Sequence, residues 1–264
     1  MEVKIPAIGC DMFESLGLEE WTPQAASVVL GLLLGLVFGV LAQISRFCLR
    51  RGLVGSGVDR ADALGVWLVA LAVAVFGTQI LVSLDVLAFD EHRFMSGNVA
   101  VGAIIAGGLL FGAGMVLSRG CASRMTVLAG SGNLRAVAVL LVFAVVAHAT
   151  LKGVLAPLRV WVSGFSVTLE NGAGLGGSGL VLAAILGMGV AAFAWRSRLG
   201  LRGLAFGVAI GALVPLGWFG TGVLLFDEFD PMPAESLTFT APMADSLFYF
   251  QASTALTPSF GLGL

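Results

Sequence analysis

The sequence predicts an all-α integral membrane protein, a polytopic bundle whose helices cross the bilayer several times. Of the 264 residues, 58% are hydrophobic and only 11% are charged, and the mean hydropathy is +1.00. A soluble domain carries charge on about a quarter of its residues, so lipid must cover most of this surface. Long apolar runs recur along the chain, and arginines fall in alternate connections between them. These observations together predict the fold class.

Apolar runs of helical length are expected to form the spans. They cover residues 25–44, 63–82, 99–117, 136–151, 180–194 and 203–225. The first three and the last are long enough to cross a bilayer, whereas the fourth and fifth are short and are expected to be tilted, broken or re-entrant. A further apolar stretch at residues 154–169 is interrupted by Pro157 and Arg159. We expect this stretch to lie at the interface or to cross half of the membrane.

The distribution of basic residues predicts the orientation. If the N-terminus is outside, the inside connections hold ten of the 14 lysines and arginines. These ten are Arg46, Arg50, Arg51, Arg60, Arg119, Arg124, Arg135, Arg196, Arg198 and Arg202. Basic residues favour the cytoplasmic side, so we expect a multi-pass protein of the bacterial inner (plasma) membrane with its N-terminus outside. If one of these runs is re-entrant and does not cross the bilayer, the number of spans changes more readily than the predicted orientation.

An internal repeat links two of the runs. Residues 35–48 (GLVFGVLAQISRFC) align without a gap with residues 108–121 (GLLFGAGMVLSRGC), at an offset of 73 and with seven of 14 positions identical. Both copies run from outside to inside, so the repeated unit is a helix pair. We therefore predict one transmembrane transport domain over residues 1–264, with repeats at about 25–97 and 98–170. Residues 187–200 form a third, weaker copy in which Gly200 takes the place of the cysteine.

The end of each copy carries the candidate substrate-binding residues. They are Ser45, Arg46 and Cys48 in the first copy, and Ser118, Arg119, Gly120 and Cys121 in the second. Arginine supplies the positive charge that an anion needs in a membrane, and helix breaks near Gly52 and Gly120 would add backbone N–H donors. A thiol is polarizable and a weak donor, which suits a soft sulfur atom better than a hydroxyl does. The pattern thus favours passage of a small sulfur-containing anion.

Other interpretations of these residues remain open. An arginine at a helix end can simply anchor it at the inner leaflet, which is the preferred interpretation for Arg50, Arg51, Arg196, Arg198 and Arg202. A free cysteine is often a small buried hydrophobe. A membrane redox or sulfur-relay protein would use Cys48 and Cys121 as a dithiol within disulfide reach. A structural subunit would tolerate loss of both thiols. No metal site, cofactor or nucleic-acid partner is expected, and the chain has no nucleotide-binding motif.

Two segments resemble a known family. Residues 107–135 (GGLLFGAGMVLSRGCASRMTVLAGSGNLR) closely resemble the signature of the sulfur-transport (YeeE/YedE) family, which includes bacterial thiosulfate uptake proteins, and residues 35–53 resemble its opening motif. The resemblance implies a permease and not an enzyme. It implies short or bent helices that converge on a constriction at mid-membrane, where Cys48 and Cys121 contact thiosulfate on its way inward. It also implies a small cytoplasmic sulfur-carrier protein as a partner.

The resemblance leaves some points open. The family geometry folds the stretches after Cys48 and Cys121 back toward the membrane centre, whereas the simple topology places them at the inner surface. Family members usually continue into another glycine-cysteine motif, so we expect this sequence to be truncated at its C-terminal end, with residues 226–260 as a loop. The same thiols and arginines would also serve a selenium compound, which is the alternative substrate.

Overall fold

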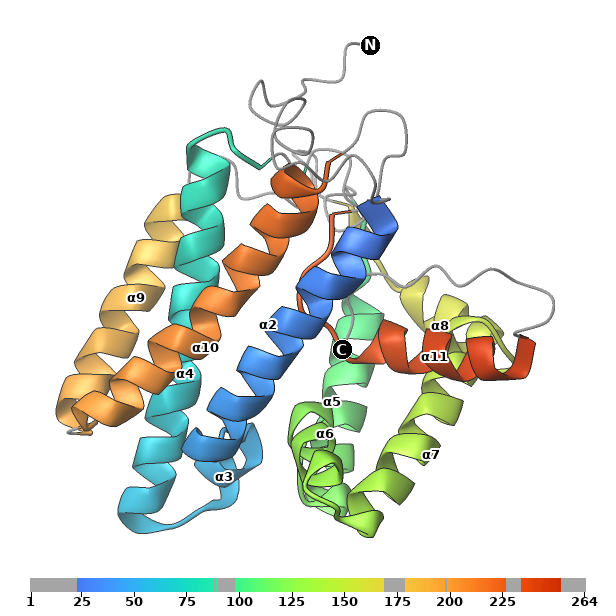
Figure 1. Ribbon diagram of the computed structural model, residues 1–264, viewed down its shortest axis with the longest axis horizontal. Coiled ribbons are helices and arrows are strands. Elements are labelled where there is room, and N and C mark those ends of the chain that lie inside the picture. Colours follow the sequence, from blue (N-terminus) through green and yellow to red (C-terminus); the bar gives the residue numbers. More distant parts are fainter. Residues whose placement is uncertain are drawn as a thin grey trace.

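The protein is built almost entirely of helices (Figure 1). The structure, a computed structural model, describes residues 23–87, 89, 98–168, 179–197, 199–226 and 234–252. Its long helices are α2 (Pro23–Ser45), α4 (Gly57–Ser83), α5 (Val101–Ser118), α7 (Leu134–Leu151), α9 (Gly179–Arg196) and α10 (Leu201–Phe219). Its shorter helices are α3 (Leu49–Val54), α6 (Ala122–Gly130), α8 (Ala156–Ser163), the π-helix η3 (Gly220–Leu224) and α11 (Thr240–Ala252). The strands β1 (Asn98–Val99) and β2 (Val167–Thr168) form one short antiparallel pair. The predicted all-α class is confirmed.

Each predicted apolar run falls mainly in one of the long helices, and the last run continues from α10 into η3. Five stretches in the described parts of the chain are long and apolar enough to cross a membrane. They are Ala25–Val54, Gly57–Ser83, Val101–Gly130, Leu134–Leu151 and Leu201–Leu224. The run in α9 forms a shorter apolar helix, Val181–Arg196. The chain is therefore a multi-pass membrane protein.

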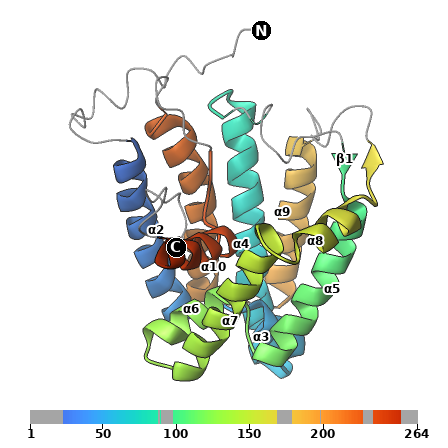
Figure 2. The same ribbon diagram turned by 90° about the vertical axis from the view of Figure 1, so that its right-hand side faces the viewer.

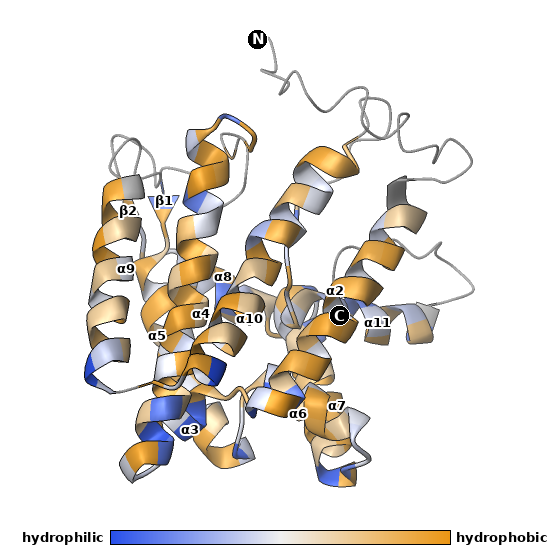
Figure 3. Cartoon of the chain, turned by 60° about the vertical axis from the view of Figure 1, so that its left-hand side comes forward, coloured by the Kyte–Doolittle hydropathy of each residue, from blue (hydrophilic) through white to orange (hydrophobic). Residues whose placement is uncertain are grey.

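The helices form two groups. Figure 1 shows α2, α3, α4, α9 and α10 on one side and α5, α6, α7, α8 and α11 on the other. In the views of Figures 1 and 2, the connections after α2, α5 and α9 reach the same end of the bundle. Those connections carry the arginine clusters, and Figure 3 shows hydrophilic colour gathered at that end. The basic segments thus share one end of the molecule, as the topology requires.

Glycines allow α10 to lie directly against α4. Gly203, Gly207 and Gly211 recur at every fourth residue of α10. A Cβ on Gly207 would lie 2.8 Å from Cγ1 of Val69 and 3.0 Å from the carbonyl oxygen of Val66. Small residues at this spacing let two membrane helices approach until their backbones touch. The α4–α10 pair is therefore the most tightly fitted contact of the first group.

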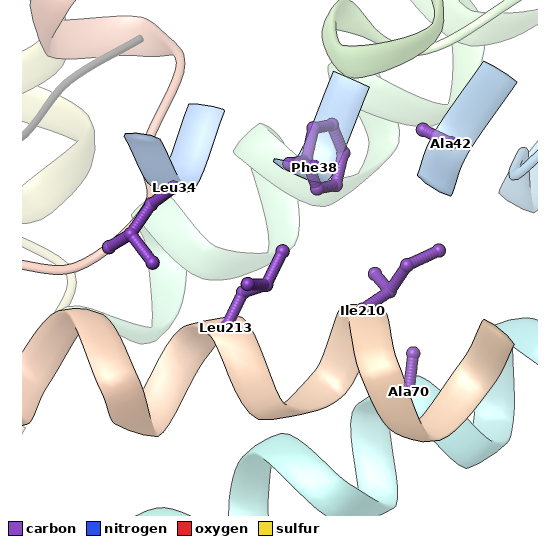
Figure 4. Packing of buried hydrophobic residues seen from close by; sticks show 6 residues of the cluster. All are labelled: Leu34, Phe38, Ala42, Ala70, Ile210 and Leu213. Atoms are coloured by element: carbon purple, nitrogen blue, oxygen red, sulfur yellow. The ribbon is translucent and has the colours of Figure 1, made fainter. Parts of the chain in front are cut away.

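A hydrophobic cluster attaches α2 to this pair. Its buried members are Leu34, Phe38 and Ala42 of α2, Ala70 of α4, and Ile210 and Leu213 of α10 (Figure 4). On α2 they are four residues apart, which places them on one face of a helix. Val127 of α6 packs against the same cluster. The first group of helices is thus joined to the second at the short helix that follows Cys121.

The interrupted stretch at residues 154–169 contains the short helix α8. Pro157 lies in the first turn of this helix. A proline is well tolerated there, because the first N–H groups of a helix have no partner within the helix. Gly164 ends the helix, and β2 follows it. The proline that breaks the apolar pattern in the sequence therefore marks a helix start.

Helix α11 lies within the segment that we expected to be a loop. It packs against α7, where Lys152 Nζ lies 2.7 Å from Asp245 Oδ1 and the ring of His148 stacks on Phe248 with a centroid separation of 5.2 Å. Pro242 falls in its first turn. The expectation of a loop over residues 226–260 is therefore wrong for residues 240–252, because their aromatic side chains find a partner surface on α7.

Asn133 caps the N-terminus of α7 and is expected to stabilise the folded protein. Its side-chain oxygen accepts hydrogen bonds from the backbone N–H groups of Arg135 (3.1 Å) and Ala136 (3.3 Å). Replacing such a cap by alanine costs about 1 kcal/mol. We expect Asn133→Ala to lower the apparent melting temperature of the purified protein in detergent, whereas Asn133→Asp keeps it. Equal melting temperatures for wild type and Asn133→Ala would contradict this role.

Candidate functional site

The first copy of the repeat ends in a sharp elbow. Helix α2 stops at Ser45, and Arg46 adopts the left-handed conformation with φ of 52°. The Arg46 N–H donates to the Gln43 carbonyl at 3.3 Å, and the Phe47 N–H donates to the Ala42 carbonyl at 3.0 Å. This pair of hydrogen bonds is the Schellman arrangement that ends many helices. The chain therefore turns sharply just before Cys48.

The second copy has the same elbow. Helix α5 stops at Ser118, Arg119 has φ of 62°, and its N–H donates to the Val116 carbonyl at 3.3 Å. The left-handed conformation usually falls to glycine, and an arginine there costs about 1 kcal/mol. The two copies thus share an unusual backbone conformation as well as sequence. The third copy differs, because α9 is followed by α10 without a short helix between them.

The predicted serines bind the backbone at their own helix ends. The Ser45 hydroxyl donates to the Leu41 carbonyl at 2.7 Å. The Ser118 hydroxyl lies 2.7 Å from the carbonyl oxygen of Gly114 and 2.8 Å from that of Gly120. The Ser118–Gly120 contact spans the second elbow, whereas the Ser45 bond lies within α2. Ser45 also faces a hollow of about 310 Å³ that Arg51 and Arg202 help to line.

The two cysteines meet at the elbows. Cys48 is the N-cap residue of α3, and Cys121 is the N-cap residue of α6. Their side chains lie close enough to interact, although the residues are 73 positions apart. Both thiols are free. Cys48 is buried and Cys121 is partly exposed, with its sulfur 3.0 Å from the hydroxyl of Ser123. The repeat therefore assembles one dithiol site from two separate helix ends.

Glycines near the elbows allow close packing. A Cβ on Gly120 would meet Cε of Met125, so the end of the methionine side chain would have to move to accept it. The chain breaks at Gly120, as expected from the sequence. In the first copy the break lies at residues 46–48, ahead of Gly52. Gly52 instead lies inside α3, where a Cβ would be 2.9 Å from the backbone nitrogen of Leu64.

The short helix after Cys121 folds back along α2. Residues of α2 between 35 and 44 and residues of α6 between 126 and 131 line the same hollow, which has a volume of about 480 Å³. Its walls are mostly apolar, with Gln43, Thr126 and Ser131 among the polar residues. Helix α6 thus lies beside the C-terminal half of α2 and not beyond its end.

The arginines of the elbows have different surroundings. Arg46 and Arg119, the two candidates from the repeat, are exposed. Arg51 forms an ion pair with Asp59, in which Nη2 lies 2.7 Å from Oδ1. Arg50 and Arg124, which we did not choose from the sequence, are half-buried and each has a buried side-chain nitrogen without a hydrogen-bond partner. A sequence signal existed for both, since each follows a repeated cysteine within three positions.

The donor set of the site is thiols, hydroxyls and guanidinium groups. Within the described residues, no group of three or more His, Cys, Asp or Glu side chains is placed to hold a metal ion. Positive charge and polarizable sulfur are instead gathered at one place. Such a site is suited to an anion that carries a soft atom.

Comparison with known proteins assigns the chain to a family. A family model described as sulphur transport matches residues 44–264, which is most of the chain. The chain belongs to the sulphur transport family. The matched region includes both elbows and both cysteines of the site. Membership in this family confirms the resemblance found in the two sequence motifs.

A curated relative agrees with this assignment. The protein named thiosulfate transporter TsuA, from Spirochaeta thermophila (strain ATCC 700085 / DSM 6578 / Z-1203), is 32% identical over 164 residues. The match covers 60% of this chain and 48% of the relative, so the chain spans about half the length of that protein. Family and relative together support transport of a sulfur-containing anion.

Proposed function

We propose that this protein conducts thiosulfate, or a related sulfur-containing anion, inward through a passage that narrows at Cys48 and Cys121. The observation that carries the proposal is the meeting of these two thiols, which come from two copies of one elbow. Membership in the sulphur transport family and the name of the relative supply the substrate class. The basic end of the bundle faces the cytoplasm of the bacterial inner membrane, and the N-terminus is outside.

The chemistry of the anion fits the residues of the site. Thiosulfate has a terminal sulfur and three oxygens. Two neighbouring thiols give the sulfur weak contacts in succession, and weak contacts let a substrate enter and leave again. The exposed Arg46 and Arg119 attract the anion toward the elbows, because opposite charge raises its local concentration. A small cytoplasmic sulfur-carrier protein would take up the sulfur on the inner side.

Radiolabelled thiosulfate uptake tests the proposal. The chain is expressed in its natural reading frame in bacterial cells without other thiosulfate importers, beside Cys48→Ala and Cys121→Ala variants at equal membrane levels. We expect uptake to fall about tenfold or more in each variant, because a lost contact of about 1.4 kcal/mol changes affinity tenfold. Cys10→Ala is the matched control, since it removes a cysteine that the proposal does not use and that lies outside the described residues.

Two outcomes would contradict the proposal. Unchanged uptake in both site variants would reduce the cysteines to packing residues. Absence of uptake by the wild type would remove thiosulfate as the substrate, and competition with selenium-containing anions would then test the alternative cargo. The closeness of the thiols also supports the alternative of a redox relay, which requires them to lie within disulfide reach. A relay predicts that the two cysteines cycle between dithiol and disulfide without net uptake of labelled sulfur. Both quantities can be measured in the same cells.

A further inference from the structure

Two arginines beside the thiols have buried nitrogen atoms that no group in the described part of the chain satisfies. These atoms are Nε of Arg50 and Nη1 of Arg124. Arg50 lies in the first turn of α3 and Arg124 in the first turn of α6. Among the described side chains, the other buried nitrogen of this kind is Nδ1 of His148, on α7. Unsatisfied positive charge is thus gathered where the two cysteine-capped helices begin.

The neighbouring arginines are compensated in other ways. Arg51 donates to both carboxylate oxygens of Asp59, at 3.0 Å from Nε and 2.7 Å from Nη2. Arg46 and Arg119 are exposed, so water solvates them. Within the described residues, the buried Nε of Arg50 and Nη1 of Arg124 have neither a carboxylate partner nor exposure to water. These two N–H groups can therefore donate hydrogen bonds to a bound group.

The repeat explains why Arg124 has no counter-ion. At the offset of 73, Arg51 aligns with Arg124, and the position of Asp59 is taken by Gly132. The first copy therefore carries a carboxylate that neutralises its arginine, and the second copy has no side chain at the aligned position. Arg124 forms no ion pair with any residue that the structure describes.

The backbones of Arg50 and Arg124 lie beside the two thiols. A Cβ built on Gly120 would lie 3.4 Å from Cγ of Arg124 and 3.5 Å from its Cβ, so the stem of Arg124 passes over the residue that precedes Cys121. The backbone amide of Arg124 lies next to the Cys121 thiol, and that of Arg50 lies next to the Cys48 thiol. The two guanidinium groups are thus tethered within a side-chain length of the dithiol.

The energetics favour an anion as the bound group. Arginine remains protonated under all relevant conditions. A buried N–H without an acceptor costs about 1–3 kcal/mol, and more when the group is charged. The oxygens of a small oxyanion accept guanidinium hydrogen bonds with good geometry. Filling the site with such an anion would remove this cost.

We propose that Arg50 and Arg124 bind the oxygen atoms of the substrate anion while the Cys48 and Cys121 thiols contact its sulfur. This assignment rests on the proposed function and specifies the charged half of the same site. It divides recognition into two parts, because the arginines select an oxyanion and the thiols select an exposed sulfur. Sulfate has the oxygens but no exposed sulfur, and it engages the arginines alone.

Replacement of each arginine by methionine tests this proposal. Arg50→Met and Arg124→Met keep most of the side-chain length without the charge, and Arg196→Met is the control at an exposed helix end on the same side of the bundle. In buffer without multivalent anions we expect Arg124→Met to be at least as stable as wild type, because an unpaired buried charge has been removed. Sodium thiosulfate should raise the melting temperature of wild type and of Arg196→Met, but not of Arg124→Met or Arg50→Met.

Uptake kinetics provide the second measurement. The KM for thiosulfate should rise about tenfold or more in the two site variants and stay unchanged in Arg196→Met, because a charge-assisted hydrogen bond is lost. Arg124→Lys keeps the charge without the planar fork and should recover part of the affinity. The proposal is overturned if Arg124→Met and Arg50→Met keep both the thiosulfate-dependent stabilisation and the wild-type KM.

The assay separates this proposal from the proposed function. If wild type neither takes up thiosulfate nor is stabilised by it, the proposed function fails. Stabilisation of wild type by sulfate or selenate that is absent in Arg124→Met would then still support an oxyanion site at the arginines. If none of these anions stabilises wild type, both proposals are refuted.

Discussion

Oxidation of the membranes with diamide is expected to join Cys48 to Cys121 and to stop uptake almost completely. The two thiols lie close enough to interact, so we expect a local movement to bring the sulfur atoms to bonding distance. Each thiol gives up one proton and one electron, and diamide accepts both pairs. A disulfide leaves no free thiol at the site and ties α3 to α6. Uptake and the mass of the linked peptides are measured before and after treatment.

Reduction and single-cysteine variants provide the controls. Dithiothreitol should restore uptake, because it reopens the bond without altering the protein. Cys48→Ser and Cys121→Ser cannot form the bond, and whatever uptake they retain should resist diamide. Linked peptides without loss of uptake would show that the thiols are close but do not lie in the path.

Replacement of Gly211 by leucine is expected to abolish folded protein. A Cβ at this position would lie 2.9 Å from Cβ of Val73 and 3.0 Å from Cα of Ala70, and it would collide with the Ala70 carbonyl oxygen. Overpacking of a core commonly costs about 1–3 kcal/mol, and here the obstacle includes backbone that cannot change its rotamer. The α4–α10 pair must separate to accept the side chain. The amount of monodisperse protein after size-exclusion chromatography in detergent measures the effect.

Gly189→Leu is the matched control for this change. Gly189 lies on α9, is exposed, and would bring no atom within 4 Å of an added Cβ. The same substitution should therefore leave the yield of folded protein near that of wild type. Equal yields for the two variants would mean that α4 and α10 do not depend on close backbone contact.

The helices and the two cysteine-bearing repeats were predictable because they depend on short-range patterns. Apolar runs of bilayer length determine where α2, α5 and α10 form. The repeat singled out Cys48 and Cys121, since chance rarely places the same serine, arginine and cysteine at the ends of two similar helices. Family membership, which the two glycine-rich motifs indicated, then supported the class of cargo that we propose.

The exposure of the arginine side chains and their ion-pair partners were not predictable from short-range sequence patterns. Sequence alignment of the copies favours Arg46 and Arg119 because they match, yet matching says nothing about exposure to water. The difference between Arg51 and Arg124 depends on whether a carboxylate lies eight residues further on. Whether a guanidinium nitrogen is buried depends on how α6 folds back along α2, a long-range contact that periodicity does not report. Helix α11 was missed for the same reason, since its partner is α7.

The two thiols of the site differ in their exposure to water. Only 8% of the surface of Cys48 is exposed, whereas Cys121 is partly open. An alkylating reagent that arrives from water therefore reaches Cys121 first, and the label on Cys48 appears later. The two cysteines should therefore be labelled in a fixed order. That order reports the direction from which a reagent in water reaches the site.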